Sequence, residues 1–237
     1  MTLRIREILT ETPRARVVRL DLNGQRFDYL AGQAVLVGQP SLPQHEPAPE
    51  RRPYSIAISP DEARRQNTLE LLVGVDASGL AGAHLTLHAG ADVEIEGPLG
   101  SFTFPENPGE RRFVFIAGGT GIAPLRAMLH QALAVTHEQI ALFYSARTPD
   151  EFAYEREFRQ LASAERIAFH QTVTRSAGEA WSGARGRIGR ADLQRLVDDH
   201  ETLCFICGPQ ALVSSTSSLL REMGIDEPRI RIERWGA

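Results

Sequence analysis

A glycine-rich turn in the second half of the sequence has the composition of a phosphate-binding loop. The apolar run at residues 113–117 leads into Gly118-Gly119-Thr120-Gly121, and a helical pattern follows with Pro124 in its first turn. Glycine lets a backbone approach a phosphate closely, and the free N–H groups at a helix N-terminus attract anions. Such turns also join strands to helices without binding anything, and this one lacks the G-x-G-x-x-G spacing of ordinary dinucleotide-binding domains. In its strand–helix context we expect it to bind the phosphates of a dinucleotide.

Three arginines follow predicted elements of the same half. Arg147 comes just after the strand-like run at residues 140–144. Arg175 follows the run at residues 167–173, and Arg187 lies in Gly-Ala-Arg-Gly-Arg-Ile. Ligands of open α/β sheets bind at the carboxyl ends of the strands, and a guanidinium can hold a phosphate through two hydrogen bonds. Each arginine alone is more typical of an exposed surface, but together they are candidates for binding a 2′-phosphate.

The cysteines and the basic residues exclude several other chemistries. Cys204 and Cys207 are the only two cysteines, too few for a Cys₄ zinc site or a Cys-ligated iron–sulfur cluster. Their spacing matches a redox or metal-binding pair, but the run at residues 203–207 has the pattern of a buried strand. We therefore expect two reduced thiols and no metal site. All 26 basic residues are arginine, which excludes a Schiff-base lysine and the lysine of a standard P-loop.

Residues 1–108 are predicted to form an antiparallel barrel or sandwich. Short apolar or alternating runs are separated by Gly, Pro, Asn and Asp, which is typical of strands joined by turns. Residues 81–87 are the one expected helix, and the proline-rich residues 39–50 are an expected surface loop. The expected strands are residues 16–22, 34–37, 54–58, 69–75 and 93–95.

Residues 109–237 are predicted to form a doubly wound α/β domain with a parallel sheet, because strand-like and helical patterns alternate. Pro105-Glu106-Asn107-Pro108 marks the boundary between the two halves. The expected strands are residues 113–117, 140–144, 167–173, 203–207 and 230–232. The expected helices are residues 123–134, 151–161, 191–199 and 209–223.

The charge and hydropathy patterns bear on location and partners. The formal net charge is −4, so no global basic field attracts nucleic acid. The N-terminus has no apolar signal segment, and no apolar run reaches the ~18 residues of a membrane span. We expect a soluble, cytoplasmic protein that binds no nucleic acid.

Six short motifs occur in an order that resembles the ferredoxin–NADP reductase superfamily, and together they extend over nearly the whole chain. The resemblance implies an antiparallel β-barrel flavin domain, residues 1–108, followed by an α/β nicotinamide domain, residues 109–237. The motifs are Gly32-Gln33, Arg52-Pro53-Tyr54-Ser55, Gly97-Pro98-Leu99-Gly100-Ser101-Phe102, Gly118-Gly119-Thr120-Gly121-Ile122-Ala123-Pro124, Cys207-Gly208-Pro209 and Glu233-Arg234-Trp235.

At the flavin, the resemblance implies that Arg52 pairs with the pyrophosphate and that Tyr54 packs its ring against the isoalloxazine. Ser55 would place its hydroxyl near flavin N5, the atom that accepts hydride, and Pro53 belongs to the same binding segment. Outside the motif, Tyr54 could be an ordinary core or surface aromatic and Ser55 a locally satisfied strand hydroxyl.

At the nicotinamide, the resemblance places Cys207, with Gly208 and Pro209, beside the ring. Glu233 would position and polarise the centre of hydride transfer. Trp235 would stack on the other flavin face or be displaced when nicotinamide enters, although two further residues follow it, unlike the terminal aromatic of plant-type reductases. Outside the motifs, Cys207 could be a small buried residue and Glu233 a solvated charge.

One motif departs from the superfamily pattern. A Gly-x-x-Ser/Thr segment normally contacts the flavin pyrophosphate from the start of a helix, and here the segment is Gly79-Leu80-Ala81-Gly82. Because Gly82 has no hydroxyl, one hydrogen bond must come from backbone or water. Backbone N–H groups at a helix N-terminus could still hold the phosphates, so FAD remains favoured over FMN.

The nicotinamide cofactor is expected to be NADPH. Ser145-Ala146-Arg147-Thr148, with Tyr154 seven residues after the arginine, resembles NADP-preferring bacterial reductases. There the arginine grips the 2′-phosphate and the tyrosine can stack on adenine, with Arg175 and Arg187 at positions of further phosphate arginines. Asp150 and Glu151 leave NADH open, because an acid binding the ribose hydroxyls favours NAD.

These features predict an FAD-dependent NAD(P)H oxidoreductase that passes electrons to a separate ferredoxin, flavodoxin or oxygenase component. Three alternatives remain: an NAD(P)H:flavin reductase that releases reduced flavin, a non-catalytic flavin- or nucleotide-binding regulatory module, and a subunit that borrows an iron–sulfur chain from another polypeptide.

Overall fold

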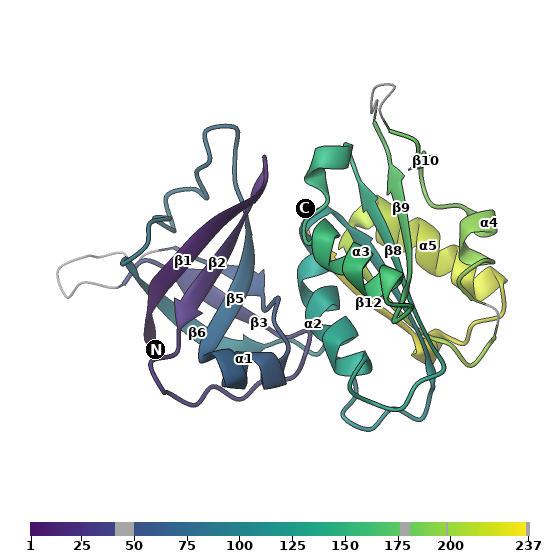
Figure 1. Ribbon diagram of the computed structural model, residues 1–237, viewed down its shortest axis with the longest axis horizontal. Coiled ribbons are helices and arrows are strands. Elements are labelled where there is room, and N and C mark those ends of the chain that lie inside the picture. The colour runs from purple at the N-terminus through teal and green to yellow at the C-terminus, as the bar shows by residue number, and fades with distance from the viewer. Residues whose placement is uncertain (41–49, 176–180, 198, 236–237) are drawn as a thin grey trace.

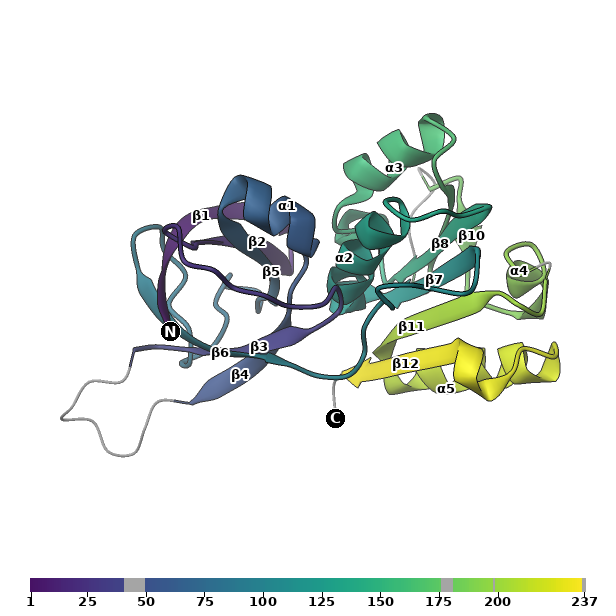
Figure 2. The ribbon, with the colours of Figure 1, turned by 90° about the horizontal axis from the view of Figure 1, so that it is seen from below.

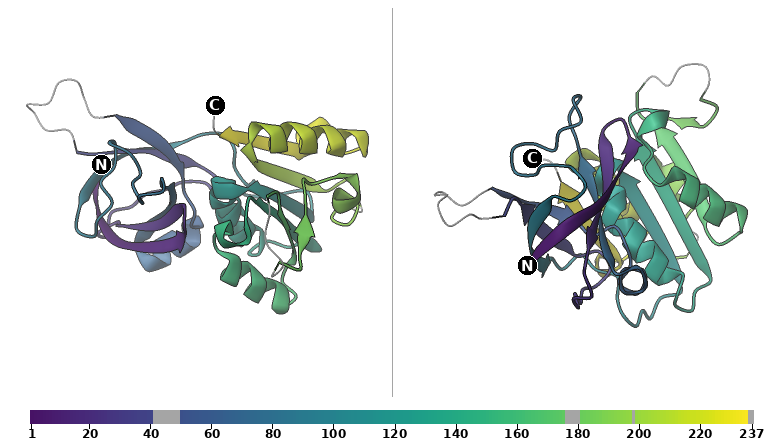
Figure 3. Two further views of the ribbon diagram at one scale, coloured as in Figure 1. Left: turned by 90° about the horizontal axis from the view of Figure 1, so that it is seen from above. Right: turned by 60° about the vertical axis from the view of Figure 1, so that its left-hand side comes forward.

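The computed structural model describes residues 1–40, 50–175, 181–197 and 199–235, with the backbone alone at Trp235. It has two parts, each built on one six-stranded sheet, which lie side by side (Figure 1, Figure 3). We call them the barrel domain, which carries β1 to β6, and the α/β domain, which carries β7 to β12. The predicted two-domain fold class is confirmed. Most of the surface loop expected at residues 39–50 lies outside the described residues.

The barrel domain is an antiparallel sheet with strand order β4-β3-β6-β1-β2-β5. An isolated bridge between Ile56, just after β4, and Leu71 of β5 joins the two edges of the sheet and closes it. Closure removes the exposed edge strands that would otherwise invite aggregation. The strands are β1 Thr2–Thr12, β2 Ala15–Asp21, β3 Ala34–Gly38, β4 Arg51–Ser55, β5 Thr68–Gly74 and β6 Asp92–Leu99.

Alternating side chains of these strands fill the barrel. Leu3 and Ile5 of β1, and Val35 and Val37 of β3, point into one buried cluster. Successive side chains of a strand face opposite sides, so alternation puts one apolar face inside. The strand β1 was absent from the prediction, although Leu3 and Ile5 show the required period of two.

The helix of the barrel domain lies elsewhere than predicted. Residues 81–87 form a loop, because Gly79 and Gly82 have φ of 82° and 105°, in the left-handed region that a right-handed helix does not use. The observed helix is α1, Pro60–Gln66, where Ser59 and Glu62 form a capping box. Ser-Pro-Asp-Glu is the sequence signature of such a helix start and could have identified it.

The α/β domain is a parallel sheet with strand order β10-β9-β8-β7-β11-β12. Its strands are β7 Arg112–Gly118, β8 Gln139–Ala146, β9 Ala168–Val173, β10 Ala184–Arg185, β11 Leu203–Pro209 and β12 Ile230–Trp235. Its α-helices are α2 Ile122–Ala132, α3 Glu155–Ser163, α4 Arg190–Leu193 and α5 Gln210–Glu222, with 3₁₀ turns at Gly119–Gly121, Pro149–Glu151 and Glu227–Arg229.

Helices cover both faces of this sheet, which explains its continuous apolar strands (Figure 2). In β7, Phe113 and Phe115 face the side of α2 and α3, whereas Val114 and Ile116 face the side of α4 and α5. The doubly wound architecture is as predicted. The expected helix at residues 191–199 is shorter, ending at Leu193, and residue 198 is not described.

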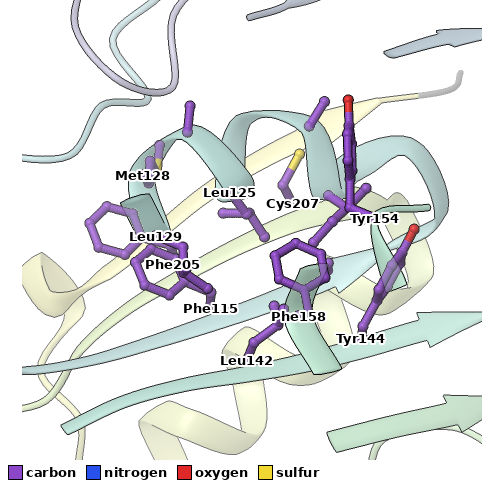
Figure 4. Packing of buried hydrophobic residues seen from close by; sticks show 14 of the residues in the cluster. Phe115, Leu125, Met128, Leu129, Leu142, Tyr144, Tyr154, Phe158, Phe205 and Cys207 are labelled. Carbon is purple, nitrogen blue, oxygen red and sulfur yellow. The ribbon is translucent and has the colours of Figure 1, made fainter. Parts of the chain in front are cut away.

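A single apolar cluster continues from the α/β domain into the barrel domain. Val17 and Leu72 of the barrel belong to this cluster. So do Leu125 and Met128 of α2, which Figure 4 shows. Gly32 lies at the contact, where a Cβ would come within 2.2 Å of the Met128 Cε atom. The glycine of the Gly32-Gln33 motif therefore allows the two domains to pack closely.

A buried ion network crosses the same contact. Arg126 of α2 donates from Nη1 to the Ala57 carbonyl at 2.6 Å and lies 3.3 Å from the Glu70 carboxylate of the barrel. Its Nε donates to Glu157 of α3 at 2.8 Å. The side chains of Arg126 and Glu70 are only 11% and 3% exposed. The network fixes α2 against the barrel.

Candidate functional site

A cleft of about 740 Å³ lies between the two domains, at the carboxyl ends of β7, β8, β9 and β11. This is where open α/β sheets bind ligands. Its barrel wall includes Arg14, Asp76 and the segment 80–82. On the α/β side it is lined by Gly118, Gly119, Thr120, Tyr144, Ser145, Ala146, Arg147, Glu151, Ala153, Thr174, Arg175, Arg187, Ile188, Pro209, Ala211, Leu212 and Ser215.

The three arginines singled out in the sequence meet in this cleft. Arg147, Arg175 and Arg187 follow three neighbouring strands, and the Arg175 N–H donates to the Arg147 carbonyl at 2.9 Å. All three side chains are exposed, and within the described residues none has an ion-pair partner. Their charge is therefore available to an anionic ligand.

The glycine-rich turn lies at the floor of the cleft. Gly118, Gly119 and Thr120 line it, whereas Gly121 and Pro124 are buried and do not. A Cβ on Gly121 would come within 2.4 Å of the Cys207 carbonyl oxygen, and one on Gly208 within 2.8 Å of Leu212. A Cβ on the buried Gly118 would likewise come within 2.7 Å of Leu212, so these three motif glycines serve the packing of the β7–α2 turn against the β11–α5 turn. Gly118 and Gly119 also line the cleft.

Cys207 and Glu233 are brought together by the parallel pairing of β11 with β12. The Cys207 thiol donates to the Glu233 carboxylate across 3.7 Å. Burial, reinforced by the Glu233 charge, raises the pKa of Cys207, so the thiol stays protonated at neutral pH. Burial also raises the pKa of Glu233, against the opposing hydrogen bond from Cys207. Both cysteines are free, and burial raises the pKa of Cys204 to about 12.

The Arg-Pro-Tyr-Ser motif forms β4. Arg52 and Pro53 are exposed, and Tyr54 and Ser55 are half-buried. The Arg52 Nε donates to Glu50 at 2.7 Å, an exposed pair of the kind worth little in water. The Tyr54 hydroxyl lies 2.7 Å from Nε2 of His84 in the loop that follows β5. Gly82 of the same loop lines the cleft.

Comparison with known proteins finds one oxidoreductase family model in each half of the chain. The family of the oxidoreductase FAD-binding domain matches residues 1–104, and that of the oxidoreductase NAD-binding domain matches residues 115–218. Ferredoxin–NADP reductase B of Sorangium cellulosum is 33% identical over 224 residues, which cover 90% of this chain and 88% of that protein. The chain belongs to the ferredoxin–NADP reductase superfamily. It is an FAD-dependent NAD(P)H oxidoreductase.

Two further proteins show the range of this superfamily. The glycine betaine monooxygenase reductase subunit of Pseudomonas aeruginosa is 30% identical over 193 residues, which cover 79% of this chain but 52% of that protein. A ferredoxin–NADP⁺ reductase from Neisseria gonorrhoeae, solved with bound FAD and NADP, has the same fold, with a TM-score of 0.79 and 20% identity over 99% of this chain and 98% of that one.

Tyr154, to which the resemblance gives adenine stacking, is not among the residues that line the cleft of this reductase, so its stacking role stays a prediction. Tyr154 is 8% exposed and packs in the apolar cluster between the domains, beside Phe158 (Figure 4). The Arg126 guanidinium lies 4.7 Å from its ring centroid, and its N–H donates to Glu11 of β1 at 2.5 Å. The 3₁₀ turn at Pro149–Glu151 and the left-handed φ of 59° at Tyr154 turn the side chain away from the cleft.

Three residues of this reductase were missed. Arg14 reaches the cleft from the β1–β2 turn, which stayed hidden because β1 was not predicted. His84 and Arg126 are held in place by partners far along the chain, and a single sequence does not indicate such contacts.

The side chain of Trp235 lies outside the described residues, so its stacking role stays a prediction. None of the described helices has the length and apolar character needed to cross a membrane.

Proposed function

We propose that this reductase oxidises NADPH at the cleft and passes the electrons through bound FAD to a separate protein. The observation that carries the proposal is the convergence of Arg147, Arg175 and Arg187 at three neighbouring strand ends, without ionic partners among the described residues. Such a cluster suits the 2′-phosphate that distinguishes NADPH from NADH. Glu151 also lines the cleft and is the residue through which NADH would compete.

The other predicted residues would bind the two rings between which the hydride is transferred, the flavin and the nicotinamide. Arg52, Tyr54 and Ser55 would hold the flavin in the barrel domain, for which we propose residues 1–108. Cys207 and Glu233 would hold the nicotinamide in the α/β domain, for which we propose residues 109–237. FAD, when bound, accepts a hydride and can pass on electrons singly; the chain orients the two rings and excludes water.

The residues of the α/β domain fit a nicotinamide dinucleotide. Gly118, Gly119 and Thr120 offer backbone to a pyrophosphate at the floor of the cleft, and Ser145 stands beside Arg147 on its wall. The protonated Cys207 thiol and the half-buried Glu233 form a hydrogen-bonded polar pair. Such a pair can position a nicotinamide ring.

For the acceptor, we propose a small electron-transfer protein, of the ferredoxin or flavodoxin type, or an oxygenase component. The proposal is supported by the relatives, one named as a ferredoxin–NADP reductase and one as the reductase subunit of a monooxygenase. The chain spans about half of the length of the second relative.

Flavin retention separates this function from that of a reductase that releases reduced flavin. The purified protein is reduced with NADPH under anaerobic conditions and passed at once through a desalting column. We expect the flavin to remain with the protein and to reduce ferricyanide or added ferredoxin. Reduced flavin in the small-molecule fraction would contradict the proposal and favour the flavin reductase.

Replacing Ser55 by alanine is expected to slow hydride transfer about tenfold, the effect of losing one hydrogen bond of ~1.4 kcal/mol at the reacting centre. The rate is measured as flavin bleaching in a single turnover with saturating NADPH. Ser101→Ala, an exposed serine of the barrel domain, is the matched control. An unchanged rate in Ser55→Ala, with flavin still bound, would remove Ser55 from the mechanism.

A further inference from the structure

We propose that His84 binds the pyrophosphate of FAD through its Nδ1–H group and supplies the hydrogen bond that Gly82 cannot make. The inference rests on the proposed function, because it concerns the flavin that this function requires. It assigns a binding role to a residue outside the superfamily motifs.

The His84 ring lies next to Gly82. A Cβ added to Gly82 would lie 3.3 Å from His84 Nδ1 and 3.6 Å from Arg52 Nη1. The superfamily motif has a hydroxyl-bearing side chain at this position. The imidazole nitrogen therefore lies next to the place from which that hydroxyl would act, beside the arginine proposed for the same phosphates.

Within the described part of the chain, one ring nitrogen of His84 is left without a hydrogen bond. The residue is 2% exposed and its Nδ1 atom is buried, yet Nδ1 has no hydrogen-bond partner among the described residues. A buried polar atom without a partner costs free energy that a ligand atom can recover. Nδ1 is thus an unused hydrogen-bonding group at the side of Gly82, which itself lines the cleft.

Tyr54 determines which nitrogen of His84 can donate. Its hydroxyl lies 2.7 Å from Nε2, and the two ring planes are within 14° of each other. When this hydroxyl donates to Nε2, the ring proton of a neutral imidazole is on Nδ1. Burial and the charge of Arg52 lower the pKa of His84, which keeps the ring neutral at neutral pH. The Nδ1–H group then meets an anionic oxygen as a donor.

Two substitutions separate the two nitrogens of the imidazole. In His84→Asn the side-chain amide can reach the position of Nδ1, and in His84→Gln it can reach the position of Nε2. We expect His84→Gln and His84→Phe to raise the dissociation constant for FAD about tenfold, as for a lost hydrogen bond to a charged group. We expect His84→Asn to stay within about threefold of the wild type.

The measurement is a fluorescence titration of the full-length apoprotein with FAD and, separately, with riboflavin, which lacks phosphate. Riboflavin affinity should change less than twofold in every variant. His88→Phe is the control, because His88 is exposed in the same loop and, among the described residues, its ring hydrogen-bonds only with the neighbouring Ala89 carbonyl.

Three results would overturn the proposal. The first is unchanged FAD affinity in His84→Gln and His84→Phe. The second is equal weakening of FAD and riboflavin, which would mean that His84 acts only by supporting the Tyr54 ring. The third is a failure of His84→Asn to retain affinity where His84→Gln loses it. If the wild type itself bound no FAD, the proposed function would fail, and the inference with it.

Discussion

Replacing Arg126 by methionine is expected to lower the free energy of unfolding by about 3 kcal/mol, the lower end of the range for breaking a buried ion pair. Arg126 and Glu70 are almost completely buried, and methionine keeps the apolar volume but removes the charge. The loss stays at the lower end because Glu70 keeps Arg19 at 2.8 Å and Glu157 keeps His130.

Arg126 stays charged although it is buried, because its acidic partners stabilise the charge. Burial opposes the charge of the guanidinium, but Glu157, Tyr154 and Glu70 outweigh it and raise the pKa of Arg126 above its usual value. The arginine therefore remains charged at every pH at which the protein folds. Its loss removes one cationic partner from each of two carboxylates, Glu70 of the barrel domain and Glu157 of the α/β domain.

Urea denaturation followed by circular dichroism measures this effect. Arg159→Met is the matched control, since Arg159 pairs with Glu155 on the surface of α3 with 57% of its side chain exposed. We expect the control to change the unfolding free energy by less than about 1 kcal/mol. Equal losses in the two variants would show that the interdomain network contributes no more than a surface pair.

Replacing Arg147 by alanine is expected to raise KM for NADPH by about ten- to a hundredfold, the range for a lost hydrogen-bonded contact with a charged group of ~1.5–3 kcal/mol. KM for NADH should change less than about threefold, because NADH has no 2′-phosphate. The cause is local, since Arg147 is exposed in the cleft and no ion pair of the described residues depends on it.

Steady-state kinetics with both nucleotides test this expectation, with ferricyanide as the acceptor. Arg166→Ala is the control, an exposed arginine of the same domain that does not line the cleft. If Arg147→Ala raised both KM values by the same factor, the arginine would contact a group common to the two nucleotides, and the preference for NADPH would lose its basis.

The sequence predicted the parts of the site that depend on local chain geometry. The strand–turn–helix pattern around Gly118 and the positions of Arg147 and Arg175 after two strands were sufficient, because parallel strands bring their carboxyl ends to one edge. Cys207 and Glu233 were given separate roles from the resemblance alone, and the register of β11 with β12, which brings them into contact, was not predicted.

The sequence was least informative where distant segments or backbone turns decide the outcome. Tyr154 lies seven residues after Arg147 and packs in the domain contact, which the spacing alone does not indicate. The helix expected at residues 81–87 failed because the loop carries glycines with positive φ. His84 meets Tyr54 across 30 residues of sequence, and Arg126 meets Glu70 across 56, so no local pattern indicates either contact.

Anaerobic stopped-flow spectroscopy of the purified flavoprotein, mixed with NADPH and with NADH in parallel, tests whether the cleft selects NADPH for hydride transfer to the flavin. We expect rapid bleaching of the flavin absorbance by NADPH and much slower bleaching by NADH at equal concentration. Faster bleaching by NADH would overturn the assignment of the arginine cluster to the 2′-phosphate. The absence of bleaching by either nucleotide, with flavin bound, would contradict hydride transfer and favour a non-catalytic flavin-binding module.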